Sequence, residues 1–149
     1  MEKPIRVSSD FVIVEFVSRN IFARYGNLST RFINPWCVRV AQQIRDRFDK
    51  PVTINNWYWG GPFQYSGFRE AECEEGALNS PHKRGQAIDL RVKGVDYQEV
   101  RKELKDNYRE YRIGLLEEGN SGWNHASNEW FISEKLAIYD LKENRFYFK

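Results

Sequence analysis

The chain contains only two histidines, His82 and His125, and each stands in a sequence context that suits a zinc site. Asp89 follows His82 at a spacing that does not fit the adjacent-turn motifs of helical zinc sites. We expect a loop histidine, a strand carboxylate with Gly85 permitting the turn between them, and a second histidine from the edge of a later strand. Two imidazoles and one carboxylate occupy three corners of a tetrahedral zinc site and leave the fourth for water, as in catalytic sites. These separate segments converge only on a rigid folded core.

The isolated residues also have an ordinary interpretation. His82 would then be a solvated loop residue, Asp89 would cap a turn, and His125 would be a hydrogen-bonded core histidine. For an unselected His and Asp pair, this interpretation is the more frequent one. The choice between the two depends on the rest of the sequence.

The composition indicates a folded domain. The chain has 149 residues, of which 41% are hydrophobic and 15% aromatic, which argues against disorder and allows a real core. We expect residues 1–149 to form one domain. The formal net charge is +2, and the Lys and Arg residues are scattered without interleaved aromatics, so we expect no nucleic-acid partner.

No apolar run approaches the roughly 20 residues that a membrane-spanning helix needs. The first residues, Met1 to Arg6, lack the hydrophobic segment of a signal peptide, so we expect a protein of the cytoplasm or one released without a cleavable signal. Free thiols are then the expected state of Cys37 and Cys73. The glutamates around Cys73 should raise its thiol pKa, which argues against a nucleophilic role.

The periodicity of apolar residues predicts two amphipathic helices. One begins at Pro35, with Asn34 as its N-cap, and ends at Asp49-Lys50-Pro51. The other runs from Tyr97 to about residue 108, with Asp96 as its cap. Residues 11–17 are ambiguous, and residues 27–34 are expected to be a loop.

Short β-branched and aromatic runs predict strands at residues 52–56, 87–92, 111–116, 129–132, 136–139 and 145–148. Residues 57–80 form a long irregular stretch, and its aromatic segment 57–63 could line a groove, although buried loop packing is the more common use of such residues. The order of elements predicts a single α+β domain, with early helices packed on a mostly antiparallel sheet.

The motif around the two histidines resembles the signature of the zinc D-alanyl-D-alanine carboxypeptidase family, which also includes the L-alanyl-D-glutamate endopeptidases of bacteriophage endolysins. The residues that carry this resemblance are Ser80, His82, Gly85, Ala87, Asp89, Trp123 and His125. Upstream, Ser9-Asp10-Phe11 with Glu15-Phe16 is similar to the N-terminal segment of short phage-type members. Residues 52–55 and 66–69 are similar to the strand and arginine loop before the first histidine. The resemblance implies the hedgehog/DD-peptidase fold and a bound Zn2+.

Residue by residue, the resemblance implies that His82, Asp89 and His125 bind the zinc ion. Ser80 matches a position that hydrogen-bonds substrate. Arg69 matches an arginine that steadies a substrate carboxylate or the developing oxyanion, a role that suits a planar guanidinium. The alternative for Arg69 is a surface ion pair with the nearby glutamates. Trp123 and Trp130, which flank the last ligand, are expected to pack behind the site.

The catalytic base departs from the better-known family pattern. Many members have a glutamate three residues before the last histidine, where this chain has Gly122. The nearest carboxylates are Glu117 and Glu118, and alternation along a strand would place only one of them on the metal's face. We favour Glu117, with Glu118 as the alternative. If both are solvated turn residues, the domain lacks a base.

The resemblance therefore implies a zinc peptidase that cleaves stem peptides of bacterial peptidoglycan, as a D-Ala-D-Ala carboxypeptidase or an L-Ala-D-Glu endopeptidase. A monomeric, phage-encoded enzyme is expected, released from the host cytoplasm by a holin or carried in the virion. One alternative is a non-catalytic zinc domain that binds wall fragments or serves as a structural virion component. A weaker alternative is a peptidase or amidase acting on substrates outside the wall.

Overall fold

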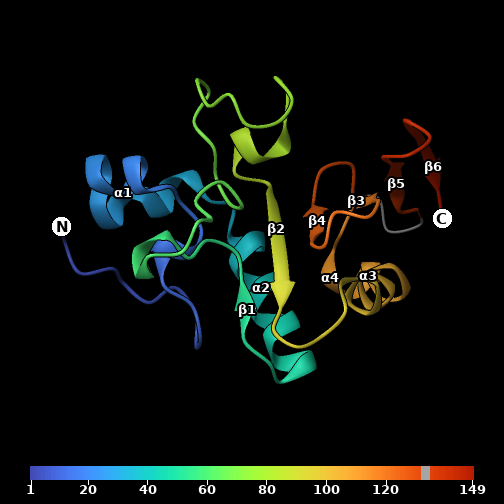
Figure 1. Cartoon of the computed structure of the whole chain (residues 1–149), viewed down its shortest axis with the longest axis horizontal. Coiled ribbons are helices and arrows are strands. Elements are labelled where there is room, and N and C mark those ends of the chain that lie inside the picture. The colour runs from blue at the N-terminus through green and yellow to red at the C-terminus, as the bar shows by residue number, and fades with distance from the viewer. Residues whose placement is uncertain (132–134) are drawn as a thin grey trace.

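The fold is organised around one six-stranded sheet. The computed structural model covers the 149-residue chain and describes residues 1–131 and 135–149. The strands lie in the order β1-β2-β4-β3-β5-β6, and all neighbours are antiparallel except β3 and β5, which are parallel. Their bounds are β1 (Val52–Thr53), β2 (Ala87–Val92), β3 (Leu115–Glu118), β4 (Asn124–Ser127), β5 (Ala137–Asp140) and β6 (Arg145–Phe148). The expected α+β architecture with a mostly antiparallel sheet is confirmed (Figure 1).

Within residues 1–131 and 135–149, four α-helices and four short 3-10 helices accompany the sheet. They are η1 (Ile13–Glu15), α1 (Arg19–Tyr25), η2 (Gly26–Phe32), α2 (Pro35–Phe48), η3 (Trp57–Trp59), η4 (Pro81–Arg84), α3 (Tyr97–Asp106) and α4 (Tyr108–Tyr111). The predicted caps are confirmed, because Asn34 accepts a hydrogen bond from the Trp36 backbone N–H (2.9 Å) and Asp96 accepts one from the Gln98 backbone N–H (2.8 Å). None of the helices that the structure describes is long and apolar enough to cross a membrane.

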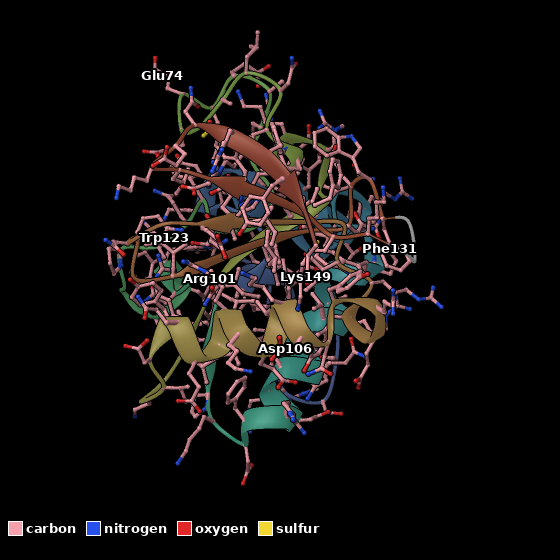
Figure 2. The ribbon with its side chains drawn as sticks, turned by 90° about the vertical axis from the view of Figure 1, so that its right-hand side faces the viewer. Glu74, Arg101, Asp106, Trp123, Phe131 and Lys149 are labelled. Carbon is pink, nitrogen blue, oxygen red and sulfur yellow. The ribbon has the colours of Figure 1, made fainter. Side chains whose placement is uncertain are left out.

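The core lies between the sheet and the helices α2 and α3. Ile88 and Leu90 of β2 are fully buried, as are Ile44 of α2 and Leu104 of α3. Figure 2 shows α3 on one side of the sheet and the loop that carries Glu74 on the other. Because side chains alternate along a strand, Asp89, between Ile88 and Leu90, points to the face opposite the helices.

Three strand predictions need correction in their bounds. The strand expected at 111–116 begins only at Leu115, because Tyr111 ends α4 and Arg112 turns the chain with a left-handed φ of 52°. The strand expected at 52–56 is confined to Val52–Thr53, since the backbone N–H of Asn55 bonds instead to the Glu15 carbonyl (3.0 Å). The strand expected at 136–139 is shifted by one residue to Ala137–Asp140.

Two further expectations were wrong. Residues 129–131 form a turn, not a strand, and Ile132 lies outside the described residues; the strand of this region is β4, which carries His125. Residues 27–34, expected to be a loop, belong largely to η2. The predictions for 87–92 and 145–148 are confirmed.

Candidate metal centre

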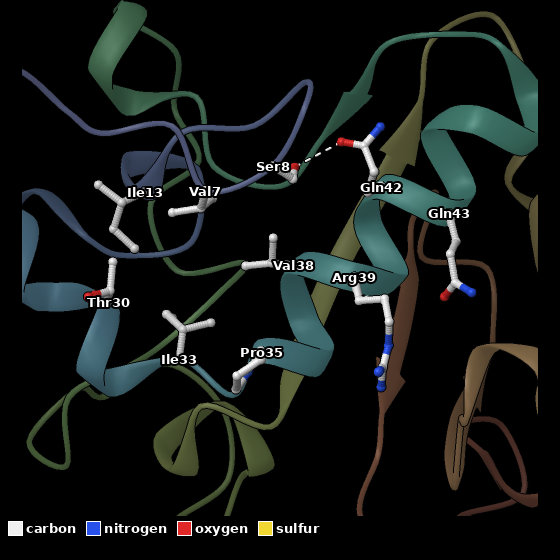
Figure 3. Close-up of a pocket in the computed structure, with 10 residues that line it drawn as sticks. All are labelled: Val7, Ser8, Ile13, Thr30, Ile33, Pro35, Val38, Arg39, Gln42 and Gln43. Atoms are coloured by element: carbon white, nitrogen blue, oxygen red, sulfur yellow. Dashed lines mark hydrogen bonds between the residues drawn. The ribbon is translucent and has the colours of Figure 1, made fainter.

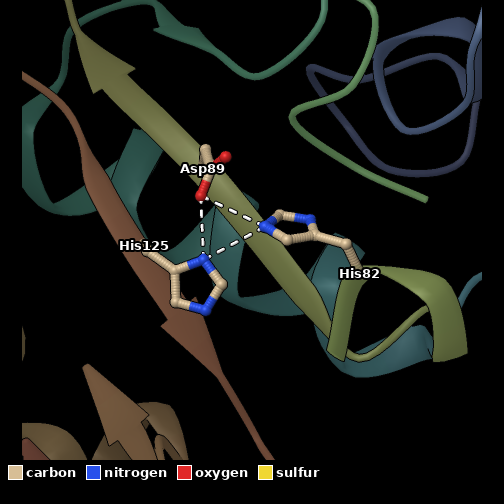
Figure 4. A group of neighbouring side chains, drawn as sticks. All are labelled: His82, Asp89 and His125. Atoms are coloured by element: carbon tan, nitrogen blue, oxygen red, sulfur yellow. Dashed lines mark hydrogen bonds and ion pairs between the residues drawn. The ribbon is translucent and has the colours of Figure 1, made fainter. Parts of the chain in front are cut away.

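Strand pairing brings Asp89 and His125 together. The two residues are direct partners in the antiparallel register of β2 and β4. Side chains of such partners project from the same face of the sheet. Asp89 Oδ1 lies 2.9 Å from His125 Nδ1 (Figure 4).

His82 reaches the same point from η4, just before β2. The Ser80 hydroxyl caps η4 by accepting a hydrogen bond from the His82 backbone N–H (3.3 Å). Gly85 ends η4 in the left-handed region (φ 67°), and a Cβ there would lie 2.0 Å from the Phe32 carbonyl oxygen. This turn places His82 Nε2 at 3.2 Å from Asp89 Oδ1 and 3.0 Å from His125 Nδ1. The predicted arrangement of loop histidine, glycine turn and strand carboxylate is therefore present.

Gly67 fixes which nitrogen of His82 faces this point. The His82 Nδ1–H donates to the Gly67 carbonyl oxygen at 2.8 Å, which leaves the Nε2 lone pair directed at Asp89 and His125. The Gly67 backbone packs so tightly that a Cβ on it would lie 2.2 Å from the Phe16 carbonyl oxygen. A side chain at position 67 would displace the carbonyl that orients the ring.

The electrostatics of the three groups are set by burial and mutual proximity. Burial lowers the pKa of His82 below its usual value, despite the opposing attraction of Asp89. Burial also opposes the charged form of His125, but its hydrogen bond to Asp89 and the Asp89 charge outweigh this and raise the pKa of His125. Burial would raise the pKa of Asp89, yet the two histidines hold it far below its ordinary range. Asp89 is thus ionised between the two histidines.

This geometry fits a divalent metal ion. The three donor atoms, His82 Nε2, Asp89 Oδ1 and His125 Nδ1, lie within 4.8 Å of one another, and all three residues are buried. Ligands about 2.1 Å from a tetrahedral zinc ion are about 3.4 Å apart, so the observed separations need to open by only a few tenths of an ångström. The Asp89 carboxylate, the lone pair of His82 Nε2 and His125 Nδ1 meet at this point, and a bound cation would replace any proton carried by His125 Nδ1. Two imidazoles and a carboxylate are a donor set that zinc accepts.

Arg69 holds the other oxygen of Asp89. Its Nη2 donates to Asp89 Oδ2 at 3.1 Å, and its Nε donates to the Tyr65 carbonyl oxygen at 2.6 Å. The side chain is largely buried, so the interaction is not a surface ion pair. The alternative in which Arg69 pairs with the side chains of the nearby glutamates is wrong. The guanidinium instead orients the carboxylate that faces the histidines.

The two adjacent glutamates of β3 face opposite sides of the sheet. Glu118 accepts hydrogen bonds from Lys105 of α3 and from the Tyr147 hydroxyl. Glu117 lines the cavity that contains the histidines, and its charge contributes to the raised pKa of His125. Strand alternation therefore separates the two carboxylates as expected, with Glu117 on the face of Asp89 and His125.

The protein-family model described as Peptidase M15 matches residues 9–126, which is most of the chain. The chain belongs to the peptidase M15 family. No curated protein and no solved structure matched it. The expected zinc carboxypeptidase family is thus confirmed, and membership supports a zinc peptidase acting on peptidoglycan in general.

The cavity of this M15 peptidase has a volume of about 500 Å³ and opens at the metal centre. Arg69, Ser80 and Glu117 line it, as do His82, Asp89 and His125. Trp123 and Trp130 also line it and are 37% and 62% exposed, so the expectation that they pack behind the site was wrong. Sequence reasoning missed Arg84, Glu129 and Phe146, which complete the wall. Arg84 and Glu129 lie close to the two histidines in the sequence, but nothing in their residue types marks them as cavity wall, and Phe146 is far from the motif along the chain.

The aromatic segment of residues 57–63 serves mainly as packing in this M15 chain. Trp57 is buried, and its Nε1–H donates to the Val17 carbonyl oxygen at 2.8 Å. None of the residues from 57 to 63 lines the metal cavity. The possible groove at this segment is therefore separate from the metal centre.

A second hollow lies between the N-terminal segment and α2 (Figure 3). Its volume is about 470 Å³, and most of its walls are apolar, including Ile13, Ile33 and Val38. Among the described residues that line it there is no His, Cys, Asp or Glu. It therefore lacks the acid, base and metal-binding groups that hydrolysis by the M15 family requires.

Proposed function

We propose that this M15 chain is a zinc peptidase that hydrolyses a peptide bond in the stem peptides of bacterial peptidoglycan. The observation that carries the proposal is the convergence of His82, Asp89 and His125 on one point, in a cavity that also contains Glu117. A lone-pair nitrogen, a carboxylate and a second imidazole are arranged around a space that suits a single cation.

The roles of the side chains follow from their positions. His82, Asp89 and His125 would hold zinc, which supplies polarisation of the scissile carbonyl and a water of lowered pKa. Glu117 accepts the proton of the attacking water and passes it to the leaving amine. Glu118 is excluded from this role because Lys105 and Tyr147 hold it on the other side of the sheet.

Arg69 and Ser80 complete the proposed machinery on the cavity wall. Arg69 fixes Asp89, and its guanidinium borders the cavity, where it can attract a substrate carboxylate or the developing oxyanion. The Ser80 oxygen already accepts from the His82 backbone N–H, which leaves its hydroxyl proton as the donor for a substrate carbonyl.

The bond that is cleaved is either D-Ala-D-Ala or L-Ala-D-Glu. A short phage-type endolysin or virion enzyme is the member type that we propose, since residues 9–16 are similar to the N-terminal segment of such members. That segment contributes to the core, because Phe11 and Phe16 are fully buried and their rings lie 5.7 Å apart. Such an enzyme would act as a monomer and would reach the wall by holin-dependent release or with the particle.

Hydrolysis of purified peptidoglycan tests the proposal. The zinc-loaded protein is incubated with walls of several stem-peptide chemistries, and new amino groups and free D-alanine are measured. We expect release by the wild type, about 10²- to 10⁴-fold slower release by Glu117→Gln, and release close to wild type by the matched variant Glu118→Gln. Free D-alanine identifies a carboxypeptidase, and new amino groups on D-glutamate identify an endopeptidase.

The second candidate function is a non-catalytic zinc domain that binds wall fragments. Gly122, three residues before His125, favours it, because many family members have a glutamate at that position. The structure gives Gly122 a φ of 80° with no neighbouring heavy atom within 4 Å of an added Cβ. Wild-type protein that binds zinc and wall fragments but releases nothing would favour this function over hydrolysis.

A further inference from the structure

The outer wall of the metal cavity is aromatic and comes from the C-terminal part of the chain. Trp130 and Phe146 both line the cavity, and their ring centroids are 5.6 Å apart. The Tyr139 ring lies 4.8 Å from Phe146. We refer to these three residues as the aromatic platform. The family model ends at residue 126, so the platform is a feature of this chain outside the segment that the M15 model matches.

Two rings of the platform are exposed to water, and exposing large apolar rings costs free energy. Trp130 is 62% exposed and Phe146 is 51% exposed. Trp130 also has a φ of 56°, a left-handed conformation that bulky residues rarely adopt. Neighbouring hydrogen bonds hold this turn, with the Glu129 backbone N–H donating to Ser127 Oγ at 3.0 Å. Exposed aromatic patches and retained backbone strain are both typical of binding sites.

Polar groups border the platform within the same cavity. Arg84 Nε donates to Glu129 Oε1 at 2.6 Å, and Arg84 Nη2 donates to the Asn79 carbonyl oxygen at 3.2 Å. All three residues line the cavity together with Trp130 and Phe146. The Trp130 and Phe146 rings are tilted by 63° to each other, so each offers its own aromatic surface beside the paired donors and acceptors. Such a site suits a ligand with an apolar C–H face and polar groups around its edge. A pyranose ring with hydroxyl and acetamido groups has this chemistry.

The position of the platform identifies the source of such a ring. The cavity is continuous from Trp130 and Phe146 of the platform to His82, Asp89 and His125. In peptidoglycan, the stem peptide is attached to a sugar of the glycan strand, so a stem peptide in the cavity brings a sugar with it. Building on the proposed function, we propose that the aromatic platform binds a sugar ring of the glycan strand and makes this chain selective for glycan-linked stem peptides over free peptides.

Two measurements on the zinc-loaded protein test this inference. The first compares kcat/KM for a free stem peptide with kcat/KM for the same peptide on its disaccharide. We expect Trp130→Ala to lose about fivefold more on the disaccharide peptide than on the free peptide, from the usual strength of a ring-stacking contact. Trp130→Tyr keeps an aromatic ring and should recover most of the kcat/KM that Trp130→Ala loses on the disaccharide peptide. Trp59→Ala is the matched control, because Trp59 is 60% exposed and does not line the cavity.

The second measurement is direct binding of a peptide-free glycan, chitotetraose, by calorimetry. We expect saturable binding by the wild type and by Trp59→Ala, and loss of binding by Trp130→Ala and Phe146→Ala. Equal losses on both substrates, or wild-type protein that cleaves stem peptides but binds no glycan, would overturn the inference and leave the proposed function intact. Wild-type protein that cleaves neither substrate would contradict the proposed function, while the binding data still report on the platform. Wild-type dimerisation that Trp130→Ala abolishes would show that the platform binds a second copy instead.

Discussion

Arg69 and Asp89 form a directed ion pair, in which Arg69 Nη2 donates to Asp89 Oδ2 at 3.1 Å while Oδ1 of the same carboxylate faces both histidines. The guanidinium is anchored in turn by the Tyr65 carbonyl oxygen. The orientation of Asp89 thus depends on a residue outside the proposed set of metal ligands. Such supporting contacts determine how well a ligand set is arranged before the ion binds.

We predict that Arg69→Lys weakens zinc binding by about 10- to 100-fold, the usual effect of losing a partner that orients a metal ligand. Lysine keeps the charge but cannot bind Tyr65 and Asp89 with a planar fork. Competition with a zinc-responsive dye measures the affinity. Arg31→Ala, an exposed arginine of η2, is the control, and equal affinity in the two variants would contradict the prediction.

Gly67→Ala should perturb both the fold and the metal centre. The new Cβ would meet the Phe16 carbonyl oxygen, so the backbone that receives the His82 Nδ1–H must shift. We expect a loss of about 1–3 kcal/mol in the free energy of unfolding, as for other overpacked sites. Zinc affinity should fall about tenfold because His82 loses its orienting acceptor. Urea unfolding and zinc titration check the two effects, and a variant with wild-type values in both would refute the argument.

Trp36→Phe tests the turn between α4 and β3. Trp36 Nε1–H donates to the Tyr111 carbonyl oxygen at 2.7 Å, and both side chains are buried. Phenylalanine leaves that carbonyl without its partner, which should cost about 1–3 kcal/mol of unfolding free energy. Zinc affinity should stay unchanged, because neither Trp36 nor Tyr111 lines the metal cavity. A change in stability below about 0.5 kcal/mol would show that the bond is dispensable.

The pH dependence of stability should carry a signature of Glu15. Burial raises the pKa of Glu15 to about 7, although the Val12 backbone N–H and Arg6 oppose the shift. The folded state therefore binds more protons than the unfolded state between the ordinary carboxyl pKa and about 7, so stability falls as the pH rises through this window. Glu15→Gln keeps an acceptor for Val12 and removes the charge.

We expect Glu15→Gln to be more stable than the wild type above pH 7 and similar to it below the ordinary carboxyl pKa. Thermal unfolding across this pH range measures the difference. A difference between the two proteins that does not change with pH would contradict the proposed origin of the effect.

The sequence was sufficient where local chemistry decides the structure. Asn34 with Pro35 and Asp96 predicted two helix starts, because an N-cap acts within one turn of its own position. The β-branched run at 87–92 predicted the strand that carries Asp89. Alternation within β3 correctly indicated that Glu117 and Glu118 would separate, since the period of a strand is independent of its neighbours.

The sequence was insufficient where distant segments decide the structure. The turn that precedes β3 includes a hydrogen bond from Trp36 to the Tyr111 carbonyl oxygen, across 75 residues of sequence, and no local pattern near residue 111 indicates it. The pairing of Arg69 with Asp89 and the exposure of Trp130 likewise result from the way the chain folds back on itself. The presence of only two histidines, each in a suitable context, indicated a zinc site as one of two interpretations, and the family resemblance favoured it over the ordinary one.

Zinc content after equilibrium dialysis tests the central claim most directly. We predict one zinc ion per wild-type chain, and a loss of this ion in His82→Ala, Asp89→Ala and His125→Ala, each checked for folding by circular dichroism. Glu117→Gln should keep the full zinc content, because Glu117 is assigned to the proton and not to the metal. Folded wild-type protein that binds no zinc, or histidine variants that keep it, would contradict the account.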